Sequence, residues 1–590
     1  MAACAPAAGG AQLVASAKAL AARLSGRMLE VGTRAPDLQR FSVFDGVRTT
    51  EREEFLNLAL EDPAVERAVG SLVGMAVGDA VGAPLEFLPA GRPGAYPGPE
   101  GSFDPRTLGY KAEYNKFCLQ RGQWTDDCAM GLCMADSLLI QGKYDGSDMR
   151  VRFWNWWFCG YNNAFRKDRA RSGSVGLGGN IAQSLSAIRR PSPPPRYDAD
   201  AEDAGNGSLM RLAPVPVFFH RDPAAAARWS AESSYTTHPG PIAAEVCGFL
   251  GYVLARAVAQ GPQERTAAQF LDACVEDYLA HVGLRAEPVH EPALNSRRVL
   301  WRVLRGEEPA GSRERCWNWR DPAGPFIEES LRARGKRYNG YPVSAGYFGS
   351  YSVDGLALAL HSVYHTDSFL AAVAKCVNFN GDADSTASIA GQMAGAFYGY
   401  GRIDTRCVAN LERWDDREVA LRGALLCVLG RDLFPTGAPG LPENPSPKRP
   451  KMHKPVPPPA AGDMEPVPSV EEELQMFTVF PRESCPHLGK VGAWRVSPDA
   501  TCSKCGEDEC WVCCSSGKIL CSRYRKAHMV EHAEQTGHCV ALSLSDLSFW
   551  CFKCDAYLDV FKIPELQPLY SECHLAKFGS LPPLPGGGGA

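Results

Sequence analysis

Two short segments of the sequence carry two aspartates and a hydroxyl-bearing residue directly before an apolar, helix-like stretch. They are GQWTDDCAMGLCMADSLL, residues 122–139, and VNFNGDADSTASIAGQMAGAFYG, residues 377–399. Their polar residues are Thr125, Asp126, Asp127, Asp382, Asp384 and Ser385. One such residue is enough to cap a helix, and the helix dipole stabilises a single charge by only about 0.3–1 kcal/mol. Capping therefore does not account for two acids and a hydroxyl that occur twice.

A shared metal site accounts for both segments. If the two helix ends meet, four aspartates come together, and repulsion would protonate them unless cations are present. Two divalent ions would neutralise four carboxylates, and oxygen ligands suit Mg²⁺, Mn²⁺ or Ca²⁺ rather than zinc. An EF-hand in the second segment is excluded, because Ala387 stands where the loop needs glycine and Met393 where it needs an acid.

A third segment, GSLVGMAVGDAVGAPLEF at residues 70–87, has a glycine at every fourth position. Four residues are a little more than one helical turn, so the glycines line one face of a helix and let another helix approach closely. The segment also contains Asp79 and Glu86, which this approach would bring towards the same centre. A membrane-dimer motif is excluded, because the segment is short and carries acids.

The whole chain has 590 residues, of which 45% are hydrophobic and 22% charged, and its net charge is −5. This weak acidity argues against a nucleic-acid partner, which would require a basic face. No run of 18 apolar residues is free of charge, so we expect no membrane span and no membrane partner. Helical periodicity dominates up to about residue 434, and strand-like alternation is scarce, so we expect a mainly α fold.

Composition divides the chain into five parts, and a Pro-rich stretch between two globular regions is typical of a linker. We predict an N-terminal extension that is disordered or a transit peptide (1–54), a large helical domain (55–434), a linker (435–475), a small Cys/His domain (476–575) and a disordered tail (576–590). We expect a cytoplasmic or nuclear protein. The transit peptide is less favoured, and the basic KRPKMHK in the linker serves solubility more often than nuclear import.

The acidic segments, together with GNGSLMR (205–211) and YTTHPGP (235–241), occur in the order seen in ADP-ribosylglycohydrolases of the dinitrogenase-reductase-activating type. The chain resembles that family from about residue 65 to 405. The resemblance implies an all-helical domain in which two Mg²⁺ or Mn²⁺ ions lie beneath ADP-ribose. It also implies a site assigned motif by motif: metal ligands Thr125, Asp126, Asp127, Asp382, Asp384 and Ser385; catalytic Glu86, with Asp126 or Asp127 sharing the role; and substrate contacts Asn206, Gly207, Ser208, Met210 and His238.

The chemistry implied by this resemblance is hydrolysis of the bond between ADP-ribose and a modified protein side chain. The ions would position a water and the ribose, and a carboxylate would transfer the proton. SGSVGLGGN (172–180) resembles, more loosely, the family's glycine-rich phosphate loop. Because some family members are inactive, the alternative is an ADP-ribose-binding adaptor without turnover.

Eleven of the 22 cysteines lie between Cys485 and Cys573, interleaved with histidines. Such clustering predicts a metal site in a reducing compartment. CPH, CSKC, HMVEH, GH and FWCFKC resemble, in order, a UBP-type zinc finger, a small α+β fold. The resemblance implies two to three Zn²⁺ ions: one on Cys485, His487, Cys551 and Cys554; one on Cys502, Cys505, Cys521 and His528; and a third on Cys513, His532 and His538.

The third zinc set lacks its fourth cysteine, because Ser516 stands at that place; Cys514 or Cys510 would have to substitute, or the site is weak or empty. The finger resemblance also implies a partner, the free C-terminal tail of ubiquitin. Arg523 would pair with its carboxylate, aromatic walls would admit only glycine, and hydroxyls would complete the site. The residues are Trp511, Arg523, Tyr524, Trp550 and Tyr557. A purely structural finger is the alternative, and no Cys and His boxes of a deubiquitinase occur elsewhere.

Overall fold

The computed structural model describes most of the two globular regions of the chain. The described residues are 8–27, 29–32, 35–90, 102–168, 170–171, 173–188, 192–199, 204–260, 265–281, 292–335, 337–338, 341–342, 346–433, 482–492, 494–497, 500–507, 510–522, 526–544, 547–554, 556–578 and 582. The chain divides into two compact units, and the main boundary between them in the sequence falls after Glu473. The predicted linker lies outside the described residues, as does most of the predicted tail.

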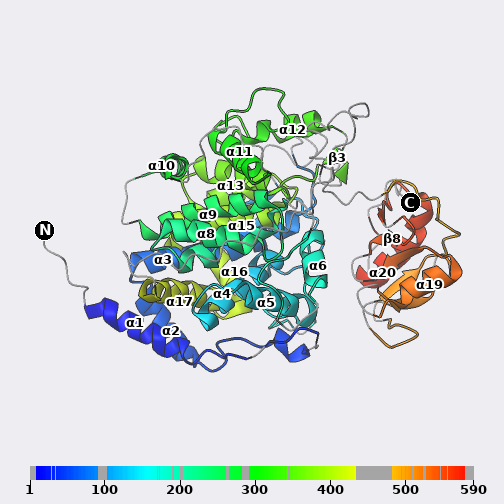
Figure 1. Cartoon of the computed structure of the whole chain (residues 1–590), viewed down its shortest axis with the longest axis horizontal. Helices are drawn as coiled ribbons and strands as arrows, with labels where there is room; N and C mark the ends of the chain where they lie inside the picture. The colour runs from blue at the N-terminus through cyan, green and yellow to red at the C-terminus, as the bar shows by residue number, and fades with distance from the viewer. Residues whose placement is uncertain are drawn as a thin grey trace, which may run out of the picture. The chain divides into compact units, whose positions relative to one another are not determined.

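The larger unit is built almost entirely from α-helices (Figure 1). Its helices are α1 (Ala8–Ala21), α2 (Thr49–Ala59), α3 (Pro63–Gly82), α4 (Asp126–Gln141), α5 (Gly146–Cys159), α6 (Gly179–Ser186), α7 (Pro214–Phe218), α8 (Pro223–Ser234), α9 (Pro241–Ala259), α10 (Ala267–His281), α11 (Pro292–Arg305), α12 (Ile327–Arg334), α13 (Ser352–Tyr364), α14 (Phe369–Val377), α15 (Ala383–Tyr398), α16 (Thr405–Asp415) and α17 (Glu418–Leu433).

Short elements connect the helices of the larger unit. They are the 3₁₀ turns η1 (Pro36–Gln39), η2 (Ala83–Leu85), η3 (Asn206–Ser208), η4 (Arg315–Trp317) and η6 (Tyr400–Arg402), and the two-residue strands β1 (Phe103–Asp104), β2 (Gly109–Tyr110), β3 (Arg337–Tyr338) and β4 (Tyr341–Pro342). The mainly α fold expected from the sequence is confirmed.

The centre of the larger unit is the contact between α3 and α15, which run antiparallel. A Cβ atom added at Gly74 would lie 2.1 Å from the carbonyl oxygen of Gly391, and one added at Gly70 would lie 2.2 Å from that of Gly395. The same pairing continues to Gly82, whose added Cβ would lie 2.4 Å from the carbonyl oxygen of Ala383. The stripe therefore lets two helix backbones touch along about three turns, as the sequence predicts.

The segment before α3 is folded as part of the larger unit, although the sequence predicted an extension. In α1, Leu13, Ala17 and Leu20 are buried, and α1 and α2 pack against α17 (Figure 1). Ser42 donates a hydrogen bond to Glu418 at the start of α17. The apolar face of the Ala-rich helix α1 therefore packs against α17, which lies about 400 residues further along the chain.

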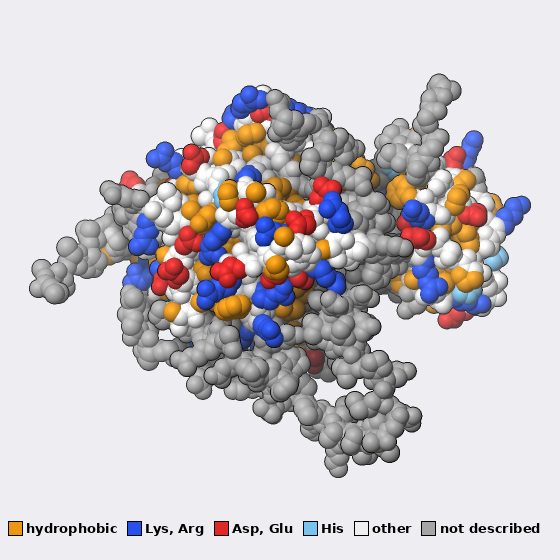
Figure 2. Space-filling view, turned by 90° about the horizontal axis from the view of Figure 1, so that it is seen from above, with side chains coloured by type: hydrophobic (Ala, Val, Ile, Leu, Met, Phe, Trp, Pro, Cys, Tyr) orange, Lys and Arg blue, Asp and Glu red, His pale blue; other side chains and the backbone are white. Residues whose placement is uncertain are grey.

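Within the part of the chain that the structure describes, two helices are long and apolar enough to cross a membrane by length and composition, α3 continued to Leu85 and α9. Within their apolar windows 89% and 78% of the residues are buried inside the unit. Packing in a helical core accounts for this composition. On the face that Figure 2 shows, Lys and Arg side chains are interspersed with Asp and Glu side chains, as the small net charge suggests.

The smaller unit contains one antiparallel sheet of order β6-β5-β7-β8-β9. Its elements are β5 (Cys510–Cys513), β6 (Ile519–Cys521), α19 (His528–Thr536), β7 (Val540–Ser543), β8 (Phe549–Cys551), β9 (Ala556–Leu558), η7 (Pro564–Leu566) and α20 (Gln567–Phe578). Val512, Leu542 and Phe549 face one hydrophobic cluster, and Trp511, Ala541 and Trp550 face another. This is the small strand-containing fold that the sequence predicts.

Candidate functional site

Six carboxylates gather where the C-terminal end of α3 meets the N-terminal ends of α4 and α15. All are buried, and the most exposed of them, Glu86, is 8% exposed. They are Asp79, Glu86, Asp126, Asp127, Asp382 and Asp384. The antiparallel pairing of α3 with α15 produces this arrangement, because it places the last turn of one helix beside the first turn of the other.

Carboxylate oxygens of this cluster form two overlapping sets, each with atoms within 4.8 Å of one another. One set contains Asp79, Asp127 and Asp384, and the other contains Glu86, Asp382 and Asp384. Asp384 belongs to both sets. Asp126 belongs to neither set.

Asp79 positions the start of α4. Its carboxylate accepts hydrogen bonds from the backbone N–H of Thr125 at 2.9 and 3.0 Å and from that of Cys128 at 2.9 Å. The Thr125 hydroxyl also lies 3.0 Å from Asp79 Oδ1 and 3.1 Å from Asp127 Oδ2. Asp79 thus supplies the cap that the Thr125 side chain does not make, and it turns Thr125 and Asp127 towards the centre.

Two oxygens of the cluster, Glu86 Oε2 and Asp127 Oδ1, are buried without a hydrogen-bond partner among the described residues. A buried, unpaired carboxylate oxygen is costly unless it binds a cation or carries a proton. The all-oxygen donor set and these orphaned atoms fit hard divalent cations such as Mg²⁺ or Mn²⁺.

Burial and mutual repulsion raise the pKa values of the carboxyl groups in the cluster when no cation is bound. Burial and the neighbouring charges of Asp384 and Asp382 raise the pKa of Glu86 well above its ordinary value. Burial raises the pKa of Asp384 to about 6 and that of Asp79 to about 7. Burial and Asp79 raise the pKa of Asp127 in the same direction. Positive charge is therefore needed to keep these groups ionised near neutral pH.

The predicted substrate residues lie together, and two of them, Asn206 and Met210, contact the start of α15. Asn206 donates a hydrogen bond of 2.8 Å to Asp382, and a Cβ added at Gly207 would lie 3.0 Å from Cε1 of His238. Ser385, beside Asp384, places its hydroxyl 3.5 Å from the sulfur of Met210. Ser208, at the end of η3, accepts hydrogen bonds from Ser234 and Cys247.

The glycine-rich segment before α6 reaches the cluster at Asp126. Gly176 has φ +91°, and a Cβ added there would lie 2.2 Å from Asp126 Oδ1. Only glycine allows this close approach in this backbone conformation. Asp126 thus connects the acidic cluster to the segment that the sequence associates with phosphates.

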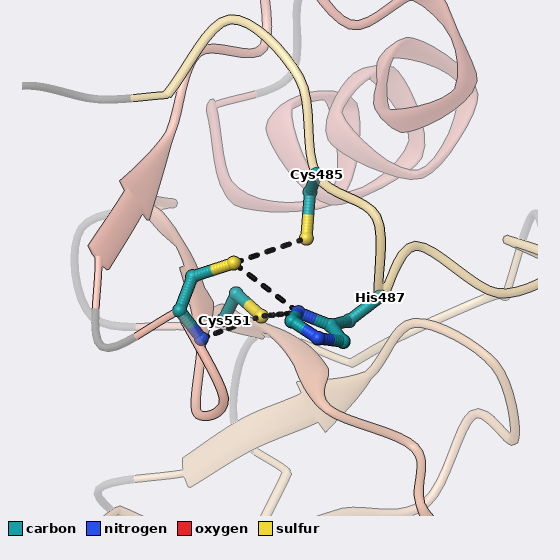
Figure 3. Close-up of side chains that lie close together, drawn as sticks. Cys485, His487 and Cys551 are labelled. Carbon is teal, nitrogen blue, oxygen red and sulfur yellow. Dashed lines mark hydrogen bonds between the residues drawn. The ribbon is translucent and has the colours of Figure 1, made fainter.

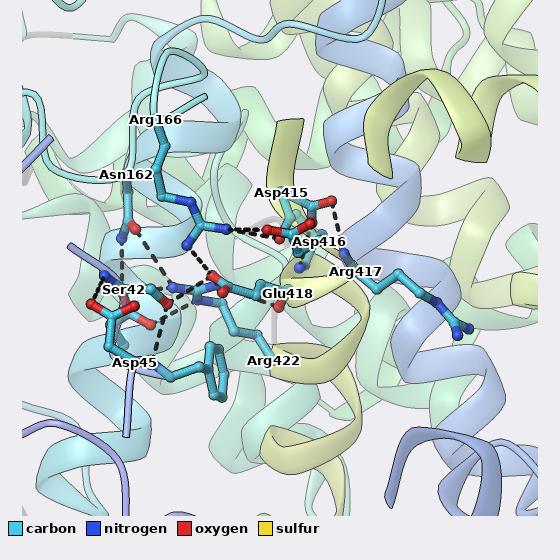
Figure 4. A network of polar contacts seen from close by, with 12 residues as sticks. Ser42, Asp45, Asn162, Arg166, Asp415, Asp416, Arg417, Glu418 and Arg422 are labelled. Atoms are coloured by element: carbon cyan, nitrogen blue, oxygen red, sulfur yellow. Dashed lines mark hydrogen bonds and ion pairs between the residues drawn. The ribbon is translucent and has the colours of Figure 1, made fainter. Parts of the chain in front are cut away.

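A buried polar network fixes the C-terminal half of α4 (Figure 4). Asp136 of α4 accepts hydrogen bonds from Arg422 of α17 at 2.7 and 3.1 Å and from Asn162 at 2.8 Å. Burial alone would raise the pKa of Asp136, but the ion pair with Arg422 holds it below its ordinary value. Glu418 joins the same network through Arg422, whose Nη1 lies 3.6 Å from its Oε2, and it also accepts a hydrogen bond from Arg166. This fixed charge pair anchors the helix whose other end carries Asp126 and Asp127.

In the smaller unit, the predicted zinc ligands form three clusters. In the first (Figure 3), Cys485 Sγ lies 3.8 Å from Cys554 Sγ, and His487 Nδ1 lies 3.2 Å from Cys554 Sγ and 3.7 Å from Cys551 Sγ. A tetrahedral zinc with Zn–S distances of about 2.3 Å places its ligand atoms about 3.8 Å apart. The spacing therefore fits zinc.

The second cluster has the same spacing. His528 Nδ1 lies 3.5 Å from Cys502 Sγ and 3.4 Å from Cys521 Sγ, and Cys505 Sγ lies 3.9 Å from Cys521 Sγ. These four residues come from a Cys–X–X–Cys turn, the end of β6 and the start of α19. This second set likewise has the number and type of ligands of a structural zinc site.

The third cluster contains Cys513, His532 and His538. The Ser516 hydroxyl lies 3.2 Å from Nε2 of His532, at the place of the missing cysteine. Neither substitute proposed from the sequence is part of this cluster. Cys510 donates to the carbonyl of Glu507, and Cys514 is buried in the hydrophobic cluster on the other face of the sheet.

The aromatic residues assigned to ubiquitin lie on one face of the sheet. Trp550 pairs with Ala541 on β7 and with Tyr557 on β9, and Trp511 pairs with Ser543. The rings of Trp550 and Tyr557 meet edge to face at 4.7 Å. Arg523 and Tyr524 lie outside the described residues, so their predicted role is carried by the sequence.

Comparison with known proteins assigns both units to families. A family model described as ADP-ribosylglycohydrolase matches residues 60–435. The chain belongs to the ADP-ribosylglycohydrolase family. A second model, described as a Zn-finger in ubiquitin-hydrolases and other protein, matches residues 502–562. Both resemblances inferred from the sequence are confirmed, and the hydrolase domain is one that acts on ADP-ribose linkages.

Individual relatives cover the two domains separately. The ADP-ribosylarginine hydrolase Tri1 of Serratia proteamaculans is 26% identical over 61% of this chain and 80% of its own length. The ADP-ribosyl-[dinitrogen reductase] glycohydrolase of Rhodospirillum rubrum is 24% identical over 62% of this chain and 98% of its own. Histone deacetylase 6 of Caenorhabditis elegans is 35% identical over 18% of this chain and 11% of its own.

Sequence reasoning placed Asp79 near the centre of the hydrolase site without giving it a role. The signal was available, because Asp79 lies on the glycine-striped helix one position after Gly78. The sequence did not point to Phe87, which has a positive φ of 71° and whose ring stacks on that of Tyr347. The two residues lie in separate segments that share no pattern. Nor did sequence reasoning assign Arg211, which is fully buried and donates to the hydroxyls of Thr236 and Thr237.

Proposed function

We propose that the chain is a metal-dependent hydrolase that removes ADP-ribose from modified protein side chains, and that its finger binds the free C-terminal tail of ubiquitin. One observation carries the first half. Two carboxylate sets share Asp384 inside a buried, all-oxygen cluster, and the cluster leaves oxygens of Glu86 and Asp127 without partners. Family membership supplies the substrate class.

Residues at both helix ends would hold two Mg²⁺ or Mn²⁺ ions. Those at the end of α4 are Thr125, Asp126 and Asp127, and those at the end of α15 are Asp382, Asp384 and Ser385. Bound there, the ions supply a Lewis acid that orients ribose hydroxyls and a water. The chain orients the ligands: Asp79 fixes Thr125, and Asn206 fixes Asp382.

Different residues around the cluster would bind the pyrophosphate, the adenine and the ribose of ADP-ribose. The Gly176 segment and the loop at Asn206 offer backbone N–H groups to the pyrophosphate, as glycine-rich segments before a helix do. His238, packed on Gly207, would lie near the adenine. These contacts would bring the ribose carbon that reacts towards the carboxylates.

Glu86 is our candidate for the proton transfer. Its Oε2 is buried and unpaired, so it can face the bond that breaks. A protonated carboxyl group there can donate its proton to the leaving group, and the carboxylate that results can then accept a proton from the attacking water. Asp126 or Asp127 would share this role where the leaving group needs less help.

The test measures release of free ADP-ribose from an ADP-ribosylated protein with Mg²⁺ and with EDTA. Asp384→Asn should lower the rate by at least about 10³, because it removes a charge from both sets. Ser385→Thr keeps the hydroxyl and serves as the matched control, with a rate near that of the wild type. Equal, near-normal rates for both variants would show that the cluster does not hold catalytic ions.

Glu86→Gln separates catalysis from binding. It should lower turnover by about 10²–10⁴ and leave the Kd for ADP-ribose nearly unchanged. Parallel loss of binding would make Glu86 a metal ligand, in line with its place in the second carboxylate set. ADP-ribose binding without release by the wild type would instead favour the adaptor, our second candidate.

The finger's role rests on its fold and on the aromatic face of its sheet. Calorimetry should show binding of ubiquitin with a free C-terminal diglycine to the full chain, and no binding of ubiquitin that lacks those two residues. Trp550→Ala should abolish the signal, since it removes one wall of the slot that admits glycine. Binding that survives removal of the diglycine would argue for a different surface.

A further inference from the structure

The residue next to Glu86 has an unusual backbone conformation. Phe87 has φ +71°, which a bulky side chain rarely adopts. Its N–H donates to the carbonyl of Gly381 at 2.9 Å, and the N–H of Gly381 donates to the carbonyl of Leu88 at 2.8 Å. Such strain persists where the surrounding structure fixes it, and it concentrates at binding sites. The pairing with Gly381, directly before Asp382, fixes the backbone of Phe87 next to the segment that carries Asp382 and Asp384.

Three further aromatic rings surround Phe87. Its ring stacks on that of Tyr347 at 5.4 Å and 15°, and it meets the rings of Tyr114 at 6.4 Å and Phe117 at 6.5 Å nearly edge on. Phe87 is half-buried, and Tyr114 is 43% exposed. Of these four rings, which we call the aromatic platform, Phe87 directly follows Glu86 in the chain and Tyr114 reaches solvent.

A cation already lies on this platform. Lys116 Nζ is 4.2 Å from the centroid of the Phe87 ring and 5.8 Å from that of Phe117. Its charge also acts on the buried carboxylate of Glu86. Ring faces attract cations, and the acidic cluster behind them adds to the attraction. The position of Lys116 shows where a positive charge is stabilised beside Glu86.

We propose that the aromatic platform is the acceptor subsite, that it selects a guanidinium, and that Lys116 occupies this place when no substrate is bound. This inference rests on the proposed function, in which Glu86 faces the leaving group. An ADP-ribosylated arginine keeps a planar, positively charged guanidinium, which can stack on the Phe87 ring. A modified serine has neither plane nor charge and gains nothing from the rings.

The test compares two peptides that differ only in whether ADP-ribose is attached to arginine or to serine. Phe87→Leu removes the ring face, keeps an apolar side chain and should lower the arginine-to-serine ratio of kcat/KM about tenfold. Lys116→Met removes the competing charge and should lower the KM for the arginine peptide about threefold. Tyr114→Leu, at the exposed rim, should lower the ratio in the same direction if Phe87→Leu does not fold.

A binding experiment separates this inference from the proposed function. Calorimetry titrates agmatine, a free guanidinium, into the full chain saturated with ADP-ribose and Mg²⁺. Phe87→Leu should weaken agmatine binding, Lys116→Met should strengthen it, and N-acetylserinamide, which carries no charge, should not bind. If the wild type cleaves neither peptide but binds agmatine in this pattern, the proposed function fails and the subsite stands. Equal effects on both peptides, or agmatine binding that neither variant changes, would overturn the subsite.

Discussion

The two domains assemble their candidate metal sites in opposite ways. In the hydrolase domain the carboxylates come from Asp79 to Asp384, more than 300 residues apart, and the contact of α3 with α15 brings them together. In the finger the ligands come from short turns and strand ends within about 70 residues, around a small core. The first site is built by the packing of two long helices. The second depends on the ion, as small zinc domains generally do.

Adding one methyl group between α3 and α15 should have the largest effect. In Gly74→Ala the new Cβ would lie 2.1 Å from the carbonyl oxygen of Gly391, which is backbone and cannot move aside. We expect a loss of about 3 kcal/mol or more in the free energy of unfolding, measured with urea, and loss of hydrolysis. Gly10→Ala in α1, where nothing lies within 4 Å, is the control and should not destabilise the chain.

Removing a zinc ligand should unfold the finger alone. Cys554→Ser takes away a sulfur that lies within 3.8 Å of both Cys485 and His487. We expect the finger to lose its resistance to proteolysis, while hydrolysis of an ADP-ribosylated peptide stays within about twofold of the wild type. A parallel loss of hydrolysis would show that the two domains do not fold independently.

The fold class, both families and the acidic segments could be predicted from the sequence, because they depend on local patterns. The glycine stripe even predicts a close helix contact. The sequence could not show that Gly74 meets Gly391, that Asp79 caps α4 or that Phe87 lies against Tyr347, since each pairing depends on the tertiary fold. It also misassigned the segment around α1, whose buried face has no local signal for its partner α17.

Withdrawal of divalent ions should reveal the crowding of the hydrolase site as a pH effect. Burial raises the pKa of Asp384 to about 6 and that of Asp79 to about 7, from an ordinary 3.8. Between about pH 4 and 7 the folded, metal-free protein therefore binds more protons than the unfolded chain, and its free energy of unfolding falls as pH rises. The fall should be smaller with Mg²⁺ than with EDTA. Groups outside the site supply a part that Mg²⁺ does not change: burial raises the pKa of Asp415 to about 6, and burial lowers the pKa of His220 and of His361 to about 4, which acts in the opposite sense.

Completing the third cluster of the finger should have a smaller effect. Ser516→Cys places a sulfur where the hydroxyl lies 3.2 Å from His532. We expect the third zinc to become slower to leave during titration with a chelator, and the melting temperature of the finger to rise by a few degrees. Ser515→Cys, one residue away, is the matched control and should change neither quantity. Unchanged zinc release in Ser516→Cys would mean that this cluster does not bind the metal.

The smallest expected effect concerns cooperation between the two sites. If the finger holds a ubiquitin tail, a modified ubiquitin meets the hydrolase domain at an effective concentration that reaches the millimolar range. Arg523→Ala should then raise the KM for ADP-ribosylated ubiquitin several-fold and leave that for an ADP-ribosylated peptide unchanged, because only the first substrate reaches the finger. Ubiquitin whose terminal carboxylate itself carries ADP-ribose should gain nothing, since it offers Arg523 no charge. A change in KM for both substrates, or for neither, would mean that the hydrolase site and the zinc finger lie on one chain but do not act on the same target.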